Sequence, residues 1–171
     1  MTLRGVCVRD ALDSALVPLR AAGVDSPWLD AELLLAATLC CDRAALRIDP
    51  ERELDGPQTR TFQALVHRRA IEREPLAYVL GEKGFRHLRL HADARALVPR
   101  PETEHLVEAA LSLPRGARVV DVGTGSGAVA LALKHERPDL DVVATDVDPD
   151  TLELARENAR RLELDVAFVG C

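Results

Sequence analysis

A glycine-rich segment is the part of the sequence best suited to bind a ligand. Residues 119–128 read Val-Val-Asp-Val-Gly-Thr-Gly-Ser-Gly-Ala, which predicts a buried strand, a tight turn and the start of a helix. Glycines let the backbone approach a ligand without a Cβ in the way, and the N–H groups at a helix start point toward it. Such a turn can hold either a dinucleotide or another adenosyl cofactor.

Two carboxylates bear on the choice of ligand. Asp121 ends the first expected strand, where its charge would repel the pyrophosphate of NAD and attract the ammonium and sulfonium groups of S-adenosylmethionine. Asp146 ends the next expected strand, where it could accept hydrogen bonds from ribose hydroxyls of either cofactor. The alternative is a structural role, in which both carboxylates accept hydrogen bonds from backbone N–H groups of turns and bind no ligand. The candidate cofactor-binding residues are Asp121, Gly123, Thr124, Gly125, Ser126, Gly127 and Asp146.

A second motif precedes this segment. Residues 98–104 read Val-Pro-Arg-Pro-Glu-Thr-Glu, so that two prolines restrict the backbone on either side of Arg100. Glu102 and Glu104 fall in the first turn of an expected helix, where acids are favourable. A stiff linker followed by a helix start would explain each residue separately. Arg100 and Glu102 are the candidate signature residues near the site.

The elements before this motif have the apolar spacing of helices. Residues 8–78 are expected to be helical throughout. Pro18 lacks an N–H group and is expected to kink or shorten the first helix. Asp30 and Glu32 lie near the start of the second helix and are expected to complement its dipole.

The remaining sequence predicts a connector and an α/β domain. A short two-stranded hairpin is expected within residues 79–100. Beyond it, strands alternate with helices, which predicts parallel βαβ units with helices on both faces of the sheet. The expected strands are 118–122, 141–145 and 166–169, and the expected helices are 102–111, 126–136 and 150–162. The expected organisation is a helical domain (1–78), a hairpin connector (79–100) and an α/β domain (101–171).

Charge and cysteine content narrow the function classes. The net charge is −6, and residues 119–171 hold 11 acidic but only 5 basic side chains, a balance that disfavours direct binding of nucleic acid. The four cysteines have neither metal-site spacing nor the density of a disulfide scaffold, and no apolar run reaches the roughly 20 residues of a membrane span. We expect a cytoplasmic protein with no metal site, in which Cys40 and Cys41 are small buried helix residues.

The two motifs together resemble the HemK/PrmC family, the release factor glutamine methyltransferases. Residues 98–104 and 121–127 carry the resemblance, and residues 23–27, 30–34 and 76–81 add to it. The resemblance implies a helical domain that docks peptide chain release factors and the first half of a Rossmann-like methyltransferase domain that binds S-adenosyl-L-methionine. It also implies that Gly123–Gly127 line the methionine side of this cofactor and that Asp146 lies at the ribose.

One family motif does not occur in the 171 residues. The sequence contains no Asn-Pro-Pro-Tyr, which the resemblance associates with the acceptor glutamine, so no catalytic residue is assigned. A poorly nucleophilic amide nitrogen needs acceptors for its N–H groups as charge develops on it. We therefore expect the chain to be the N-terminal portion of such an enzyme and inactive alone. The alternatives are a DNA or RNA amino-methyltransferase, a nicotinamide oxidoreductase and a non-catalytic partner-binding module.

Overall fold

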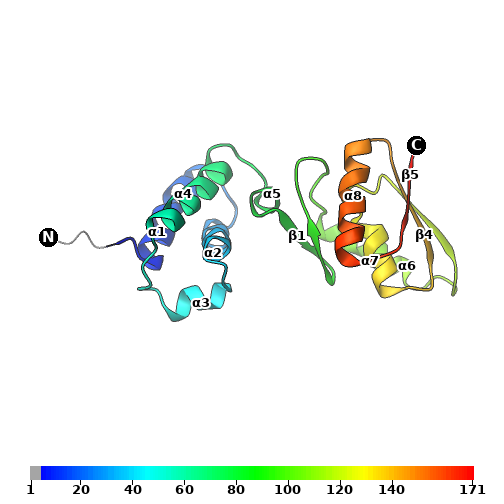
Figure 1. The fold of residues 1–171 in the computed structure, drawn as a ribbon, viewed down its shortest axis with the longest axis horizontal. Helices are drawn as coiled ribbons and strands as arrows, with labels where there is room; N and C mark the ends of the chain where they lie inside the picture. Colours follow the sequence, from blue (N-terminus) through cyan, green and yellow to red (C-terminus); the bar gives the residue numbers. More distant parts are fainter. Residues whose placement is uncertain (1–4) are drawn as a thin grey trace. The chain divides into compact units, whose positions relative to one another are not determined.

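The computed structural model describes residues 5–171, which form two compact units (Figure 1). Unit 1 is the described chain up to Leu80, and unit 2 is Gly81–Cys171. Each unit has its own buried apolar cluster.

Unit 1 is helical, as the apolar spacing predicts. Its core includes Leu19, Leu34 and Leu35, which are fully buried. The longest helix begins with a capping box, in which the Asp55 carboxylate accepts from the Gln58 N–H while the Gln58 side chain accepts from the Asp55 N–H. The helices are α1 (Val8–Ala21), α2 (Pro27–Thr38), α3 (Arg43–Ile48), α4 (Gly56–Ala70) and α5 (Leu76–Leu80).

Pro18 does not end helix α1, which continues to Ala21, and the Pro18 carbonyl accepts from the Ala22 N–H at 2.9 Å. The expectation for Cys40 is wrong. Cys40 lies beyond the end of α2, is exposed and has a positive φ of 49°. Helix α2 has already ended at Thr38, so the helical burial expected for Cys40 does not occur.

The acids of α2 do more than complement its dipole. Arg69 Nε donates to Asp30 Oδ2 at 2.7 Å and so ties α4 to α2. Arg43 and Arg47 both donate to the Glu32 carboxylate, which is completely buried. Burial alone would raise the pKa of Glu32, but hydrogen bonds from Arg47 and Arg43 outweigh it, and the pKa is lowered. Both acids therefore connect α2 to other helices.

Unit 2 begins with an antiparallel hairpin and continues into a parallel sheet. The hairpin pairs β1 (Glu82–Phe85) with β2 (Leu88–His91). The sheet contains β3 (Arg118–Val122), β4 (Asp141–Asp146) and β5 (Ala167–Gly170) in the order β3-β4-β5. The helical elements are η1 (Pro101–Thr103), α6 (Glu104–Ala110), α7 (Ala128–Glu136) and α8 (Pro149–Leu162). The expected fold class, helices followed by a hairpin and an α/β sheet, is confirmed.

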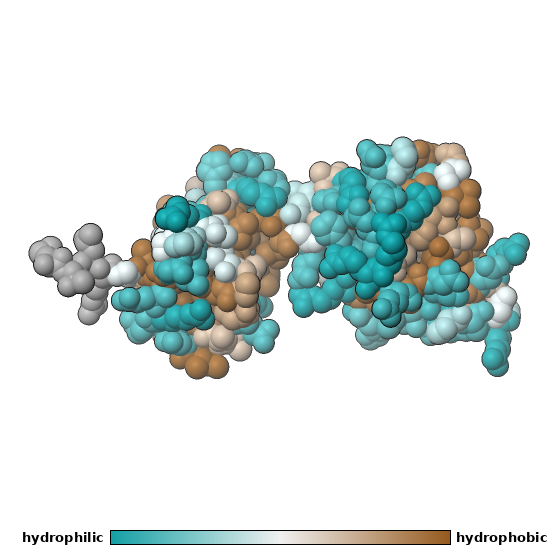
Figure 2. Space-filling view, in the orientation of Figure 1, coloured by the Kyte–Doolittle hydropathy of each residue, from teal (hydrophilic) through white to brown (hydrophobic). Residues whose placement is uncertain are grey.

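The expectation of helices on both faces of the sheet is wrong for the described residues. Helices α7 and α8 pack on the same face (Figure 1), because consecutive right-handed crossovers between neighbouring strands place their helices on one side. The other face is left with Val120, Val122 and Val169, whose exposed fractions are 53%, 77% and 49%. Hydrophobic residues accordingly reach the surface of unit 2 (Figure 2).

No helix within residues 5–171 combines the length and apolar character needed to cross a bilayer.

Candidate functional site

The glycine turn between β3 and α7 adopts a left-handed backbone at three positions. Gly123, Gly125 and Gly127 have φ values of +74°, +58° and +83°. A Cβ on Gly127 would lie 2.9 Å from Cδ1 of the buried Leu131, so a side chain here would force Leu131 to shift, in addition to adopting a backbone conformation that favours glycine. A Cβ on Gly123 or Gly125 would meet nothing within 4 Å, so these two glycines border open space.

The turn is anchored to the neighbouring strand by its backbone. The N–H groups of Gly123 and Thr124 both donate to the Thr145 carbonyl, each at 2.9 Å. Thr124 and Ser126 are buried, with exposed fractions of 6% and 4%. The turn therefore has a fixed position at the carboxyl ends of β3 and β4, the edge where open parallel sheets bind their ligands.

Both candidate carboxylates hold the turn. Asp121 Oδ2 accepts from Thr124 Oγ1 at 2.7 Å and from the Ala130 N–H at 3.3 Å, in the first turn of α7. Asp146 Oδ2 accepts from the Gly125 N–H at 3.0 Å. The turn-capping role left open by the sequence is therefore present in the structure. A half-buried position leaves each carboxylate accessible to a ligand as well.

A groove of about 290 Å³ lies beside the turn. Residues 97–100 of the connector, with Thr103 and Leu106, form one wall. Residues 121–126, with Ala128 and Val129, form the other wall. The groove thus brings Arg100 of the second motif together with Asp121 and the first part of the glycine turn.

Other candidate residues lie outside the groove lining. Gly127 supports the turn from beneath, against α7 and α8, and Asp146 contacts the turn from the end of β4. Glu102 is exposed in η1, whereas Glu104 accepts from the Arg86 N–H at 3.0 Å and ties α6 to the hairpin turn. The structure therefore separates the two signature residues, with Arg100 in the groove and Glu102 on the surface.

The connector that forms the first wall is held by an ion-pair cluster. Arg95 donates to both oxygens of Asp93, and its guanidinium also donates to Glu157 of α8 at 3.0 and 2.7 Å. Hydrogen bonding from Arg95 lowers the pKa of Asp93 to about 2. The cluster fixes the connector against α8 just before it reaches the groove.

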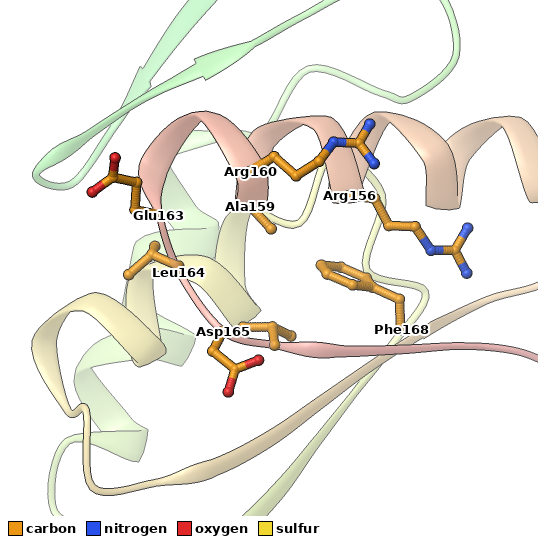
Figure 3. Close-up of a pocket in the computed structure, with 8 residues that line it drawn as sticks. Arg156, Ala159, Arg160, Glu163, Leu164, Asp165 and Phe168 are labelled. Carbon is orange, nitrogen blue, oxygen red and sulfur yellow. The ribbon is translucent and has the colours of Figure 1, made fainter.

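A second hollow, of about 420 Å³, lies between α8 and β5 (Figure 3). Arg156 and Phe168 both line this hollow, and the Arg156 guanidinium carbon is 5.9 Å from the centre of the Phe168 ring. The hollow shares no lining residue with the groove, and none of the candidate residues lines it. Within residues 5–171, no three His, Cys, Asp or Glu side chains are grouped so as to hold a metal ion.

Sequence reasoning missed Asn158, which contacts the glycine turn from α8. Its Nδ2 donates to the Ser126 carbonyl at 3.0 Å, and the residue is 1% exposed. The one feature of the sequence that could have indicated Asn158 is its low helix propensity, which is unusual within a helix of otherwise favourable residues. Its partners are 32 and 67 positions away in the sequence, so spacing alone could not identify them.

Two protein families match the chain. Residues 10–81 match the PrmC N-terminal domain, and residues 101–170 match the methyltransferase small domain. The second match covers β3, β4 and the glycine turn between them.

Relatives named release factor glutamine methyltransferase match nearly the whole chain. Release factor glutamine methyltransferases from Koribacter versatilis and Deinococcus radiodurans are 46% and 47% identical over 94% and 95% of this chain. The chain spans 58% and 59% of their respective lengths. Among solved structures, a methyltransferase from Pyrococcus furiosus is 25% identical with a TM-score of 0.42, over 64% of this chain and 50% of that one. The chain thus matches a PrmC N-terminal domain followed by a methyltransferase small domain, and over nearly its whole length it is similar to the first part of release factor glutamine methyltransferases.

Proposed function

We propose that the groove of unit 2 binds S-adenosyl-L-methionine. Gly123–Ser126 would border the methionine part of the cofactor, and Asp146 would accept hydrogen bonds from its ribose. For a chain that also includes the acceptor motif, we propose methyl transfer to the side-chain amide of a glutamine in a peptide chain release factor. Relatives 46% and 47% identical to this chain carry that activity in their names.

One observation carries the proposal. Carboxylates from two adjacent parallel strands, Asp121 and Asp146, both contact a glycine turn beside a groove. Asp146 suits the ribose hydroxyls of either adenosyl cofactor, whereas the charge of Asp121 attracts an ammonium group and repels a pyrophosphate. The G-x-G-x-x-A spacing fits NAD equally well, so Asp121 is the feature that distinguishes the two cofactors.

The cofactor would supply an electrophilic methyl group on a positively charged sulfur. The residues of this chain would bind and orient it, because the turn is already held by hydrogen bonds to Thr145 and Asp146 and needs little rearrangement. Asp121 would contribute attraction to the ammonium group. The 171 residues contain no Asn-Pro-Pro-Tyr, so the proposal for these residues is donor binding.

For unit 1 we propose docking of the release factor. The unit presents exposed apolar side chains from several helices, which suit a protein partner. They include Val17, Trp28 and Ile48, with exposed fractions of 72%, 45% and 82%. Action on release factors would place the protein in the cytoplasm.

Calorimetric titration of the 171-residue chain with S-adenosylhomocysteine and, separately, with NADH tests donor binding. We expect heat from the first ligand only, and at least tenfold weaker binding in Asp121→Asn, about 1.4 kcal/mol. Circular dichroism of the variant checks its fold, because Asp121 also supports the turn. Binding of NADH with no binding of S-adenosylhomocysteine would refute the proposal.

A further inference from the structure

The side chain of Asn158 uses its amide group to join three parts of unit 2. Its Oδ1 accepts from the His91 N–H at 2.6 Å, and its Nδ2 donates to the His91 carbonyl at 3.1 Å. The same Nδ2 donates its other hydrogen to the Ser126 carbonyl at 3.0 Å. Asn158 is 1% exposed, so these three hydrogen bonds replace the ones that its amide would make with water. Loss of any of them leaves a buried polar group without that hydrogen-bond partner.

One partner of Asn158 lines the groove, and the other precedes the opposite wall in the chain. His91 ends β2, and the connector continues from it to Val98–Arg100, on the first wall. Ser126 belongs to the glycine turn, on the second wall. A single side chain on α8 therefore helps to set the separation of the two walls.

A second side chain of α8 holds the same connector closer to the groove. Thr151 is 7% exposed, and its Oγ1 donates to the Arg95 carbonyl at 2.5 Å. Thr151 and Asn158 are seven residues apart, which places them on one face of the helix, two turns from each other. Asn158 thus bonds the glycine turn and the end of β2, whereas Thr151 bonds the connector at Arg95.

We propose that Asn158 is a positioning residue of the donor site, supported by Thr151. It holds the Ser126 carbonyl and the end of β2, from which the chain runs to the first wall, so that the groove keeps the width that a bound adenosyl cofactor requires. This inference rests on the proposed donor binding for its ligand, but the geometry of the turn can be measured without one.

The test compares Asn158→Asp with Leu140→Ala in the 171-residue chain. Asn158→Asp keeps the size of the side chain and an acceptor for His91, but turns a carboxylate oxygen toward two carbonyl oxygens. Leu140 is 1% exposed and precedes β4 at the opposite ends of the strands, so Leu140→Ala destabilises the core without touching the turn. Both variants are studied below their unfolding transitions.

Hydrogen exchange of the Gly125 and Gly127 amides provides the ligand-independent measurement. These amides donate to Asp146 and to the Thr124 carbonyl, and they report on opening of the turn. We expect exchange at least tenfold faster in Asn158→Asp and little changed in Leu140→Ala. Equal exchange in the two variants would overturn the positioning role, whether or not S-adenosylhomocysteine binds.

Titration with S-adenosylhomocysteine provides the functional measurement. We expect at least tenfold weaker binding in Asn158→Asp, a smaller loss in Thr151→Val and wild-type affinity in Leu140→Ala. Thr151→Val should leave Gly125 exchange unchanged, because Thr151 does not contact the turn. Wild-type affinity in both Asn158→Asp and Thr151→Val would refute the proposal, whereas failure of the unsubstituted chain to bind would count against donor binding itself.

Discussion

Asp146 and Gly125 are joined by a hydrogen bond in which the backbone N–H of the turn donates to the carboxylate at 3.0 Å. The end of β4 thus holds the middle of the loop that follows β3. Asp121 holds the same loop from β3 through Thr124. The two acids have similar structural roles but lie on different strands, which allows their contributions to ligand binding to be separated.

Substitution of each acid should change the affinity for different parts of the cofactor. Adenosine has the ribose but no ammonium group, so Asp146→Asn should weaken binding of both adenosine and S-adenosylhomocysteine. Asp121→Asn should weaken binding of S-adenosylhomocysteine alone. Competition titrations measure both affinities, and a loss of adenosine binding in Asp121→Asn equal to that in Asp146→Asn would contradict the division of roles.

Substitution of Gly127 should destabilise unit 2 more than substitution of Gly123. Gly127→Ala must adopt a positive φ and also overlap Leu131, for an expected loss of about 2 to 4 kcal/mol. Gly123→Ala has the same backbone cost but open space around the new methyl, so about 1 to 2 kcal/mol is expected. Urea unfolding followed by far-ultraviolet circular dichroism measures both, and equal losses would show that the overlap relaxes freely.

Removal of the Glu32 charge should destabilise unit 1. Glu32→Gln replaces a buried carboxylate that accepts from two arginines, with an expected loss of about 1 to 3 kcal/mol. Trp28 is the only tryptophan and lies on the same helix, so its fluorescence reports on this unit. The matched control is Glu51→Gln, whose ion pair with Arg9 is exposed and should contribute little. A loss no larger than that of the control would argue against a stabilising role for the buried cluster.

Acid should weaken unit 2 partly through Asp93. Its pKa is lowered to about 2 by Arg95, compared with about 3.9 in an unfolded chain. The stabilisation is therefore complete above about pH 4 and is lost as the pH falls toward 2. Urea midpoints between pH 2 and 5 should fall less steeply in Asp93→Asn than in the unsubstituted protein. Parallel curves would mean that this carboxylate does not contribute.

Local patterns in the sequence predicted most of the elements. Strand β3 has the predicted limits, because its valines are followed at once by a glycine turn. The start of α8 is marked by Asp148, whose side chain accepts from the Asp150 and Thr151 N–H groups. Such signals lie within a few residues of the structure that they produce, and so they can be recognised in a single sequence.

Relationships between distant residues could not be predicted in the same way. Asp30 pairs with Arg69 across 39 positions, and Asn158 pairs with His91 across 67. From residue type alone, Asp30 is expected only to complement the helix dipole, and Asn158 to be an ordinary helix residue. The placement of both crossover helices on one face likewise follows from strand order, which depends on tertiary packing and not on periodicity.

The bare valine face of the sheet has a practical consequence for work with this chain. Val120, Val122 and Val169 present branched side chains to water on one face of the sheet, and β5 is an edge strand of that sheet among the described residues. The apparent molar mass from light scattering should increase with protein concentration, and dilute conditions or a mild detergent should return it to the monomer value. Val122→Thr would keep the β-branched shape that strands favour and add a hydroxyl group that hydrogen-bonds with water, which should reduce this association.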